Sequence, residues 1–371
     1  MKILISSILI VCFSIAVTAQ DSTLTLLFMG DIMGHDSQIT SARQTDGSYD
    51  YNPVFEYLSP LISETDVAIA NLEVTLAGPP FKGYPQFSSP DALGLALKNA
   101  GIHYLVTANN HSVDRGKKGL ERTLDQLDSL GIQHTGTFRS PAEKTKQPFL
   151  WIEQKGFRLA LINYTYGTNG IPVHPDNHVN LIHRDSLSND IAKAKAAKPD
   201  KVIVLLHWGN EYQRQPNKNQ IDLASHCFNA GADIIIGSHP HVIQKSEWYS
   251  DNLNNNESFI TYSLGNFISN QRKQFTDGGQ MIKLTLQRDT NNCYISESGY
   301  LLTWVYTPVV DQKKHFYILP CAEYELKPEF FVSPEHFEKM KLFIADSRNL
   351  LNTNNHKVSE YLFYENQWIN R

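Results

Sequence analysis

The sequence is poor in cysteine and has no strong excess of charge of either sign. Four cysteines occur in 371 residues, and no two of them form a Cys-x-x-Cys pair. This scarcity excludes a thiolate zinc site and a dense disulfide framework, and it leaves room for one disulfide among Cys227, Cys293 and Cys321. The formal net charge is −5, with acids and bases interspersed, so the basic surface typical of nucleic-acid binding is missing. We expect no nucleic-acid partner.

A hydrophobic run long enough to span a membrane comfortably is also missing. The apolar stretch at residues 3–17 follows the single charged residue Lys2 and falls short of the ~20 residues that cross a bilayer. Small residues come directly after it, which predicts a signal peptide at residues 1–19, cut before Gln20. We expect a protein exported to the periplasm or cell envelope, with an uncut, membrane-anchored form as the alternative.

The sequence contains neither a lysine-bearing phosphate loop nor a Gly-x-Ser-x-Gly elbow, which excludes P-loop and serine-hydrolase chemistry. Instead it repeats one pattern, in which a short apolar run ends in polar residues and a helical stretch follows. The apolar runs predict strands over residues 24–31, 67–73, 102–111, 157–164, 201–209, 232–241 and 259–267. Helices are predicted over residues 89–100, with Ser89 as the cap, 120–130 and 219–230. This alternation is typical of an α/β layered domain.

The pattern changes after residue 270. Strands without intervening helices are predicted over residues 278–287, 300–310 and 315–321, and a closing helix over 334–350. No low-complexity linker divides the chain. We therefore expect one domain at residues 20–270. Residues 271–371 would either complete a second sheet or form a small appended subdomain.

Polar side chains that could bind a metal follow the apolar runs. They are Asp31, Asn71, Glu73, Asn110, His111, His207, His239 and His241. Because strands of a layered α/β domain end at a shared edge, these residues are expected to converge. Imidazole nitrogen with carboxylate and amide oxygen suits zinc, manganese or iron, and is too rich in nitrogen for calcium or magnesium. Each residue alone could serve as a turn, a cap or a packing residue, so the prediction depends on the whole set.

Six motifs in the same order resemble the CapA family of bacterial capsule synthesis proteins, which is associated with poly-γ-glutamate. That family is divergent within the calcineurin-like metallophosphoesterase fold. The motifs are GDIMGHD (30–36), ANLEVTL (70–76), TANNHSVDRG (107–116), LLHWGNEY (205–212), GSHPHV (237–242) and SLGNF (263–267). The resemblance implies a four-layer sandwich, in which two β-sheets are flanked by helices and a metal site lies at one edge.

The resemblance also implies roles for individual residues. One or two divalent ions, zinc, manganese or iron, would be bound by Asp31, Glu73, Asn110, His207, His239 and His241. His111 would donate a proton to the leaving group, with Asp114 as the nearest acid. Asn71 would lie close to the metal.

The sequence departs from the phosphoesterase pattern at three places. Met33 stands where those enzymes have the histidine of an Asp-x-His motif, and His35 comes two residues later. A metal ligand is thereby removed, which leaves one metal or two as open alternatives. The usual Asn-His-acid motif has Ser112 in the third place, and Glu73 replaces a shorter aspartate.

Other residues near the motifs carry weaker predictions. Arg115 could contact an anionic substrate or lie on the surface in water. Asn266 could line the site or shape a turn. His174, His178 and His183 occur in a polar stretch with acids nearby and are predicted to lie on the surface.

Two functions follow as alternatives. The first is an exported metal-dependent hydrolase that cleaves a phosphoester or a bond within an anionic envelope polymer. The second is a non-catalytic accessory protein that guides such a polymer, with a membrane-bound polymer synthase as a partner. The sequence does not identify the substrate.

Overall fold

The computed structural model describes residues 22–251, 256–289, 292–364 and 367–370. The predicted signal peptide lies outside these residues. Within them, no helix is both long and apolar enough to cross a membrane.

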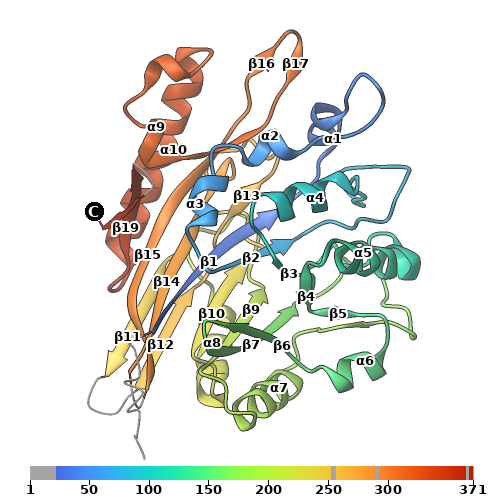
Figure 1. Cartoon of the computed structure of the whole chain (residues 1–371), viewed down its shortest axis with the longest axis vertical. Coiled ribbons are helices and arrows are strands. Elements are labelled where there is room, and N and C mark those ends of the chain that lie inside the picture. The colour runs from blue at the N-terminus through green and yellow to red at the C-terminus, as the bar shows by residue number, and fades with distance from the viewer. Residues whose placement is uncertain (1–21, 252–255, 290–291, 365–366, 371) are drawn as a thin grey trace, which may run out of the picture.

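The strands form two large sheets, called here the first and the second sheet (Figure 1). The first runs in the order β20 (Gln367–Asn370), β19 (Ser359–Tyr364), β15 (Cys293–Tyr306), β14 (Gly278–Arg288), β1 (Ser22–Ile32), β2 (Val67–Leu72), β3 (Tyr104–Val106) and β4 (Gln133–Thr135), with β13 (Asn266–Ile268) on β1 and β18 (Tyr317–Pro320) on β15. The second runs in the order β11 (Ser246–Asp251), β12 (Asn256–Thr261), β10 (Ile234–Ser238), β9 (Lys201–His207), β7 (Phe157–Thr165) and β6 (Leu150–Gln154). Two short pairs join β5 (Thr137–Phe138) to β8 (His178–Val179) and β16 (Val309–Val310) to β17 (Lys313–Lys314).

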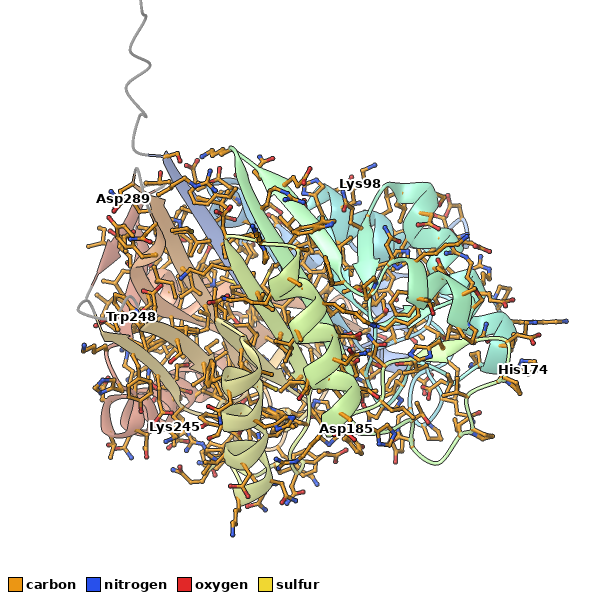
Figure 2. The ribbon with its side chains drawn as sticks, turned by 90° about the horizontal axis from the view of Figure 1, so that it is seen from below. Lys98, His174, Asp185, Lys245, Trp248 and Asp289 are labelled. Carbon is orange, nitrogen blue, oxygen red and sulfur yellow. The ribbon has the colours of Figure 1, made fainter. Side chains whose placement is uncertain are left out.

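Helices cover the outer faces of both sheets, except that the two C-terminal helices, Cys321–Tyr324 and Pro334–Asn354, pack their apolar side chains into the cluster on the other face of the first sheet. The helices are α1 (Asp36–Ala42), α2 (Asn52–Phe55), α3 (Ser59–Ser63), α4 (Ala92–Asn99), α5 (Gly116–Leu130), α6 (Pro141–Lys146), α7 (Arg184–Ala196), α8 (Lys218–Ala230), α9 (Cys321–Tyr324) and α10 (Pro334–Asn354), with a 3-10 turn at Pro328–Phe330. Apolar side chains of α2, α3 and α4 pack on the first sheet, and those of α7 and α8 pack on the second. Figure 2 shows α7 and α8 lying side by side across the strands of the second sheet.

The main core lies between the two sheets. Leu26 and Phe28 of β1 point into it, toward a cluster that includes Ile234 and Ile236 of β10. Leu27, the residue between them, points the other way and packs with the helices. Because β1 is covered on both faces, it appears in the sequence as a continuous apolar run. The predicted order of layers, helix, sheet, sheet and helix, is confirmed.

The C-terminal part of the chain contributes central strands. β14 pairs antiparallel with β1 from Ser22 opposite Arg288 to Phe28 opposite Ile282, and β15 pairs along the whole length of β14. These strands therefore continue the sheet that carries β1 and β2.

Several details differ from the sequence predictions. The cap predicted at Ser89 is wrong, because Ser89 N–H donates to Thr75 O and α4 begins only at Ala92, after Asp91. The strand predicted over residues 102–111 is limited to Tyr104–Val106. Helix α7 was not predicted, since its buried Leu187 and Ile191 are diluted by charged residues. Among the described residues all three cysteines are free thiols.

Candidate metal centre

The candidate centre begins at Asp31, next to the end of β1. Asp31 lies in register between Asn71 of β2 and Asn266 of β13, and it is fully buried. Asn71 Nδ2 donates to Asp31 Oδ1 at 2.8 Å. That bond fixes the carboxylate and leaves Oδ2 directed toward the second sheet, where it lies 3.1 Å from His241 Nδ1.

Glu73 follows β2 directly, and its backbone N–H donates to Ile32 O at 3.0 Å. Its side chain is fully buried. Neither carboxylate oxygen has a hydrogen-bond partner among the described residues. Oε1 lies 3.4 Å from His207 Nε2 and 3.8 Å from His241 Nε2. A buried carboxylate without donors is costly, so this group requires either a proton or a cation.

His207 is the last residue of β9 and connects the two sheets. Its Nδ1 lies 3.0 Å from Ser238 Oγ and 3.3 Å from Asn71 Nδ2. Its Nε2 lies 2.7 Å from Asn110 Oδ1. Ligand atoms around one zinc-type cation stand about 3 Å apart, since each bond is about 2.0–2.2 Å long. Asn110 Oδ1 and Glu73 Oε1, at 2.7 and 3.4 Å from His207 Nε2, lie close to that spacing.

The turn after β10 holds the other two histidines in left-handed backbone conformations, with φ of 96° at His239 and 57° at His241. Such conformations cost about 1–3 kcal/mol each and occur mainly at functional sites. The turn is held by Tyr212 N–H, which donates to Pro240 O at 2.8 Å, and by a weaker contact from His239 N–H to Asp31 Oδ2 at 3.4 Å. His239 Nδ1 has no hydrogen-bond partner in the described part of the chain.

Two groups of three side chains could each hold a cation. One comprises Glu73, His239 and His241, and the other Asp31, Glu73 and His207, with the ligand atoms of each group within 4.8 Å of one another. Glu73 belongs to both groups. The donor set, with its unpaired buried oxygens and nitrogen, fits a borderline divalent cation such as zinc, manganese or iron.

Burial shapes the ionisation of these groups. It raises the pKa of Glu73 well above its usual range, and the negative charge of Asp31 adds to this effect. It lowers the pKa of His207 well below its usual range and, with the neighbouring His241, lowers the pKa of His239 to about 3. Both imidazoles are therefore neutral at pH 7, which is the form that binds a cation.

His111 lies one residue past Asn110, and its ring is oriented by a carboxylate. Its Nδ1 lies 2.8 Å from Asp114 Oδ2, and both side chains are almost fully buried. Asp114 is held in turn by Phe87 N–H at 2.7 Å, while the Phe87 ring packs edge-on against the imidazole. The helical turn after His111 thus places an acid three residues later in the position needed to orient it.

A family comparison supports this arrangement of motifs. The model of "Bacterial capsule synthesis protein PGA_cap" matches residues 25–271. The chain belongs to this capsule synthesis family. The resemblance found in the sequence is confirmed.

Two of the similar proteins are named for capsule or PGA biosynthesis. The capsule biosynthesis protein CapA of Bacillus anthracis is 30% identical over 281 residues, which cover 72% of this chain and 65% of that protein. The PGA biosynthesis protein CapA of Bacillus subtilis is 28% identical over 291 residues, which cover 73% of this chain and 70% of that protein. The chain thus spans about two thirds of the length of these relatives. Among solved structures, a calcineurin-like phosphoesterase, YfkN from Bacillus subtilis, is similar with a TM-score of 0.45 and 15% identity, covering 76% of this chain and 91% of that one.

Three predicted residues lie around the centre of this capsule synthesis protein, outside the two groups of three ligands, and one of them, Asn266, has a buried Oδ1 without a hydrogen-bond partner among the described residues. Asn266 Nδ2 donates to Thr276 O at 2.8 Å and lies 3.4 Å from His241 O, so the side chain fastens the turn. His35 begins α1, accepts from Asn270 N–H at 3.2 Å and packs against Phe87. Arg115 is half-buried and its guanidinium lies 3.5 Å from Pro80 O.

Two further residues belong to the site and were not predicted. Asn109 Nδ2 donates to Leu72 O at 2.7 Å, and its Oδ1 accepts from His111 N–H at 3.0 Å, so it ties the end of β2 to the turn that carries His111. Tyr166, 47% exposed, lies over the rings of His239 and His207 with centroids at 4.5 and 6.3 Å. Asn109 follows β3 and Tyr166 follows β7, so the rule that selected polar residues after apolar runs could have found both.

Proposed function

We propose that this capsule synthesis protein is an exported, metal-dependent hydrolase that cleaves a phosphoester or a bond within an anionic envelope polymer. The observation that carries the proposal is the combination of unpaired buried ligand atoms, on Glu73 and His239, with an oriented histidine beside them. A purely structural site would leave neither an unsatisfied carboxylate nor an aligned histidine–aspartate pair.

The residues of the candidate centre have different proposed roles. Asp31, Glu73, His207, His239 and His241, with Asn110 beside them, would hold the cation. A divalent cation, when bound, polarises the bond under attack and stabilises developing negative charge.

His111 would act as the general acid. Asp114 accepts from Nδ1 and stabilises the protonated ring, so Nε2–H is free to donate to the leaving group. Asn109 holds the backbone of His111, which fixes the direction of that donation. Tyr166 would form one wall of the substrate site, since its half-exposed ring covers the histidines.

The experiment combines metal analysis with turnover. We expect the purified protein to contain zinc, manganese or iron and to hydrolyse a chromogenic phosphodiester or shorten poly-γ-glutamate chains. His239→Ala is expected to lower metal content, and His111→Ala to abolish turnover with the metal retained. His103→Ala, which changes an exposed histidine, serves as the control. A protein without metal, or activity that survives His239→Ala, contradicts the proposal.

An accessory role is the second candidate, and the buried Met33 favours it, because a methionine occupies a position at which related hydrolases have a ligand. In that case the protein would guide the polymer or its membrane-bound synthase without turnover. An Asp31→Ala, His111→Ala double variant that still supports polymer display in cells would select this role.

Export is part of the proposal and is supported by the apolar stretch at residues 3–17. Cell fractionation and N-terminal sequencing test it. We expect an N-terminus at Gln20 in the periplasm or envelope fraction. An intact leader in the membrane fraction would indicate the anchored form.

A further inference from the structure

Exposed tyrosines gather around the candidate metal centre. Tyr84 is 69% exposed, Tyr166 47% and Tyr212 43%. Within the described part of the chain one further tyrosine, Tyr249, exposes a comparable fraction, and its ring stacks on His356. Single exposed rings are ordinary on protein surfaces, but three of them beside one centre are a feature of that centre.

Two of the three rings pack against histidines of the centre. The ring of Tyr166 lies 4.5 Å from that of His239, and the ring of Tyr212 lies 6.4 Å from that of His241. Tyr212 holds its position in a left-handed backbone conformation, with φ of 65°, which is unusual for a bulky residue. Strained backbone of this kind is found mainly at functional sites, so the placement of the Tyr212 ring points to a role.

The third ring, Tyr84, borders the side of the proposed general acid. It packs edge-on at 6.4 Å against Phe87, whose ring covers His111. The loop that carries Tyr84 is closed by two backbone hydrogen bonds between Lys82 and Ser88, at 3.0 and 2.8 Å. The ring is therefore presented by a loop of fixed shape.

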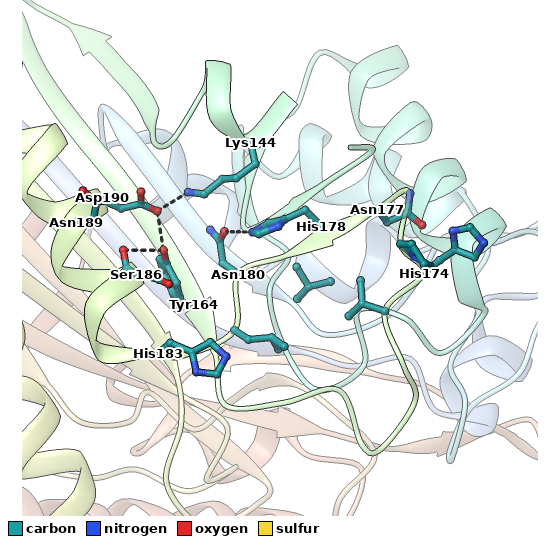
Figure 3. Close-up of a pocket in the computed structure, with 14 residues that line it drawn as sticks. Lys144, Tyr164, His174, Asn177, His178, Asn180, His183, Ser186, Asn189 and Asp190 are labelled. Carbon is teal, nitrogen blue, oxygen red and sulfur yellow. Dashed lines mark hydrogen bonds and ion pairs between the residues drawn. The ribbon is translucent and has the colours of Figure 1, made fainter. Parts of the chain in front are cut away.

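The segment that presents Tyr166 is also anchored. Tyr166 N–H donates to His207 O at 3.0 Å. Two residues earlier, Tyr164 Oη donates to Asp190 Oδ2 at 2.6 Å, and Lys144 Nζ lies 2.5 Å from the same oxygen (Figure 3). A ring that is already held in place loses little conformational freedom when a ligand stacks on it, which favours binding.

Two of the phenols are neutral at pH 7. Burial raises the pKa of Tyr166 and of Tyr212 to about 12, and the charge of Glu211 adds to both effects. Tyr84 also contributes to the raised pKa of Tyr212, so these two phenols lie near each other. A neutral phenol offers an uncharged ring face for stacking.

In the described part of the chain, the charged groups beside the tyrosines do not form a basic surface. Three are cations and two are carboxylates, namely Lys82, Arg115, Lys273, Asp36 and Glu211. Lys82 pairs with Asp36 at 2.9 Å, and Lys273 Nζ lies 5.2 Å from the centre of the Tyr212 ring. The single excess positive charge suits one anionic group of a substrate and gives little attraction for an extended polyanion.

We propose that Tyr84, Tyr166 and Tyr212 bind the substrate, and that the substrate carries an uncharged ring next to a single phosphoester group. The ring stacks on the tyrosines, and the phosphoester lies at the centre. The inference rests on the proposed hydrolysis and narrows its substrate. A poly-γ-glutamate chain has a carboxylate on every residue and no ring, so it suits the three tyrosines less well.

Calorimetry on the protein as isolated tests the proposal with three phosphonates that cannot be hydrolysed. We expect phenylphosphonate, cyclohexylphosphonate or both to bind about tenfold more tightly than methylphosphonate. The first two probes distinguish a flat aromatic ring from a saturated one. A Tyr84→Ala, Tyr166→Ala, Tyr212→Ala triple variant should bind all three probes equally, and a thermal melt checks that it is folded.

Matched variants identify the groups responsible. Tyr166→Phe and Tyr212→Phe keep the rings and should keep the preference. Tyr249→Ala removes a tyrosine of similar exposure on β11 and should leave all three affinities unchanged. The proposal is overturned if no probe binds, if the three bind equally to the wild type, or if the preference survives in the triple variant.

Turnover of a chromogenic phosphodiester, measured separately, distinguishes this proposal from the hydrolysis on which it rests. Turnover by a protein that shows no ring preference leaves hydrolysis standing and overturns the role of the tyrosines. A tyrosine-dependent preference without turnover has the opposite meaning, because the rings then bind a ligand that the centre does not cleave.

Discussion

At the scale of single residues, Asp114 fixes the orientation of the His111 ring and determines which ring nitrogen carries the proton. The carboxylate accepts from Nδ1, and in the proposed function the other ring nitrogen, Nε2, faces the leaving group. The pair is enclosed by Phe87, which contributes both a backbone N–H and its ring. Water has little access, so the hydrogen bond is stronger than it would be on the surface.

Replacing Asp114 by asparagine tests this orientation. Phe87 N–H and His111 Nδ1 both contact Asp114 Oδ2, so the amide oxygen can accept from both, but it lacks the negative charge that stabilises the protonated ring. We expect turnover to fall about 10²- to 10⁴-fold with metal content unchanged. The Nδ1 proton of His111 should also move upfield in the NMR spectrum, because a hydrogen bond to a neutral amide oxygen is weaker than one to a carboxylate. Asp222→Asn, an exposed change on α8, is the control, and unchanged turnover and spectra would contradict the orienting role.

His35 makes stability depend on pH. Burial lowers its pKa to about 4, against 6.5 for the unfolded chain. As pH falls below 6.5, the unfolded state takes up the proton first, so stability decreases until about pH 4 and this contribution is constant below that. The difference between the two pKa values of His35 corresponds to at most about 3 kcal/mol in the free energy of unfolding.

The test is urea unfolding of the wild type and of His35→Asn between about pH 7 and about pH 4.5. Asparagine is a favourable residue at the start of a helix, so α1 should persist. We expect the variant to lose less stability on acidification. A residual slope remains in both proteins, because burial also lowers the pKa values of other histidines, namely His134, His178, His207, His239 and His336. Identical pH profiles would show that His35 is not the responsible group.

At the scale of elements, Gly237 limits how β10 can be built. A Cβ at this position would lie 1.9 Å from Tyr262 O and 2.6 Å from Trp208 Nε1, two atoms that are hydrogen-bonded to each other. The strand therefore needs a residue without a side chain immediately before the turn that carries His239.

Gly237→Ala is expected to lower the free energy of unfolding by about 3 kcal/mol or more. Gly167→Ala is the matched control, because its Cβ would meet no described heavy atom within 4 Å, and its change should stay within about 0.5 kcal/mol. Equal effects in urea denaturation would mean that β10 can shift away from Tyr262 and Trp208 at little cost.

The elements also show what the sequence could and could not predict. Strands β1, β7, β9 and β10 were predictable, because burial on both faces requires uninterrupted apolar runs. The convergence of the polar residues was also predictable, because the carboxyl ends of parallel strands lie at the same edge of a sheet. Helix α7 could not be predicted with the same rules, because only one side of it is buried and charged residues occupy the other positions. Contacts such as Asn109 with Leu72 O join segments that no local pattern relates.

At the scale of the whole molecule, the strands after residue 277 are part of the central architecture. The family match ends at residue 271, yet β14 is the antiparallel neighbour of β1 and supplies Ile282, Leu284 and Leu286 to the core between the sheets. A protein ending at residue 270 would leave one edge of β1 unpaired and its apolar face open to water.

We therefore expect residues 22–270 alone to be insoluble or to lack cooperative unfolding. A chain that ends at Asn354 loses β19, which pairs with β15 at only Gly299 and Tyr300, and should remain folded with reduced stability. Soluble yield, near-UV circular dichroism and urea unfolding distinguish the two. A cooperatively folded 22–270 fragment would show that the later strands form an appendage.

The candidate centre takes Asp31 and Glu73 from one sheet and its histidines from the other. A cation there would act as a cross-link between the two sheets, in addition to hydrogen bonds such as that of His207 with Asn110 and that of His241 with Asp31. Loss of the cation should increase the rate of global unfolding, while the structure within each sheet should change little. Conversely, resizing a core side chain such as Leu24, near the opposite end of β1 from Asp31, should alter cation affinity by changing the spacing between the sheets.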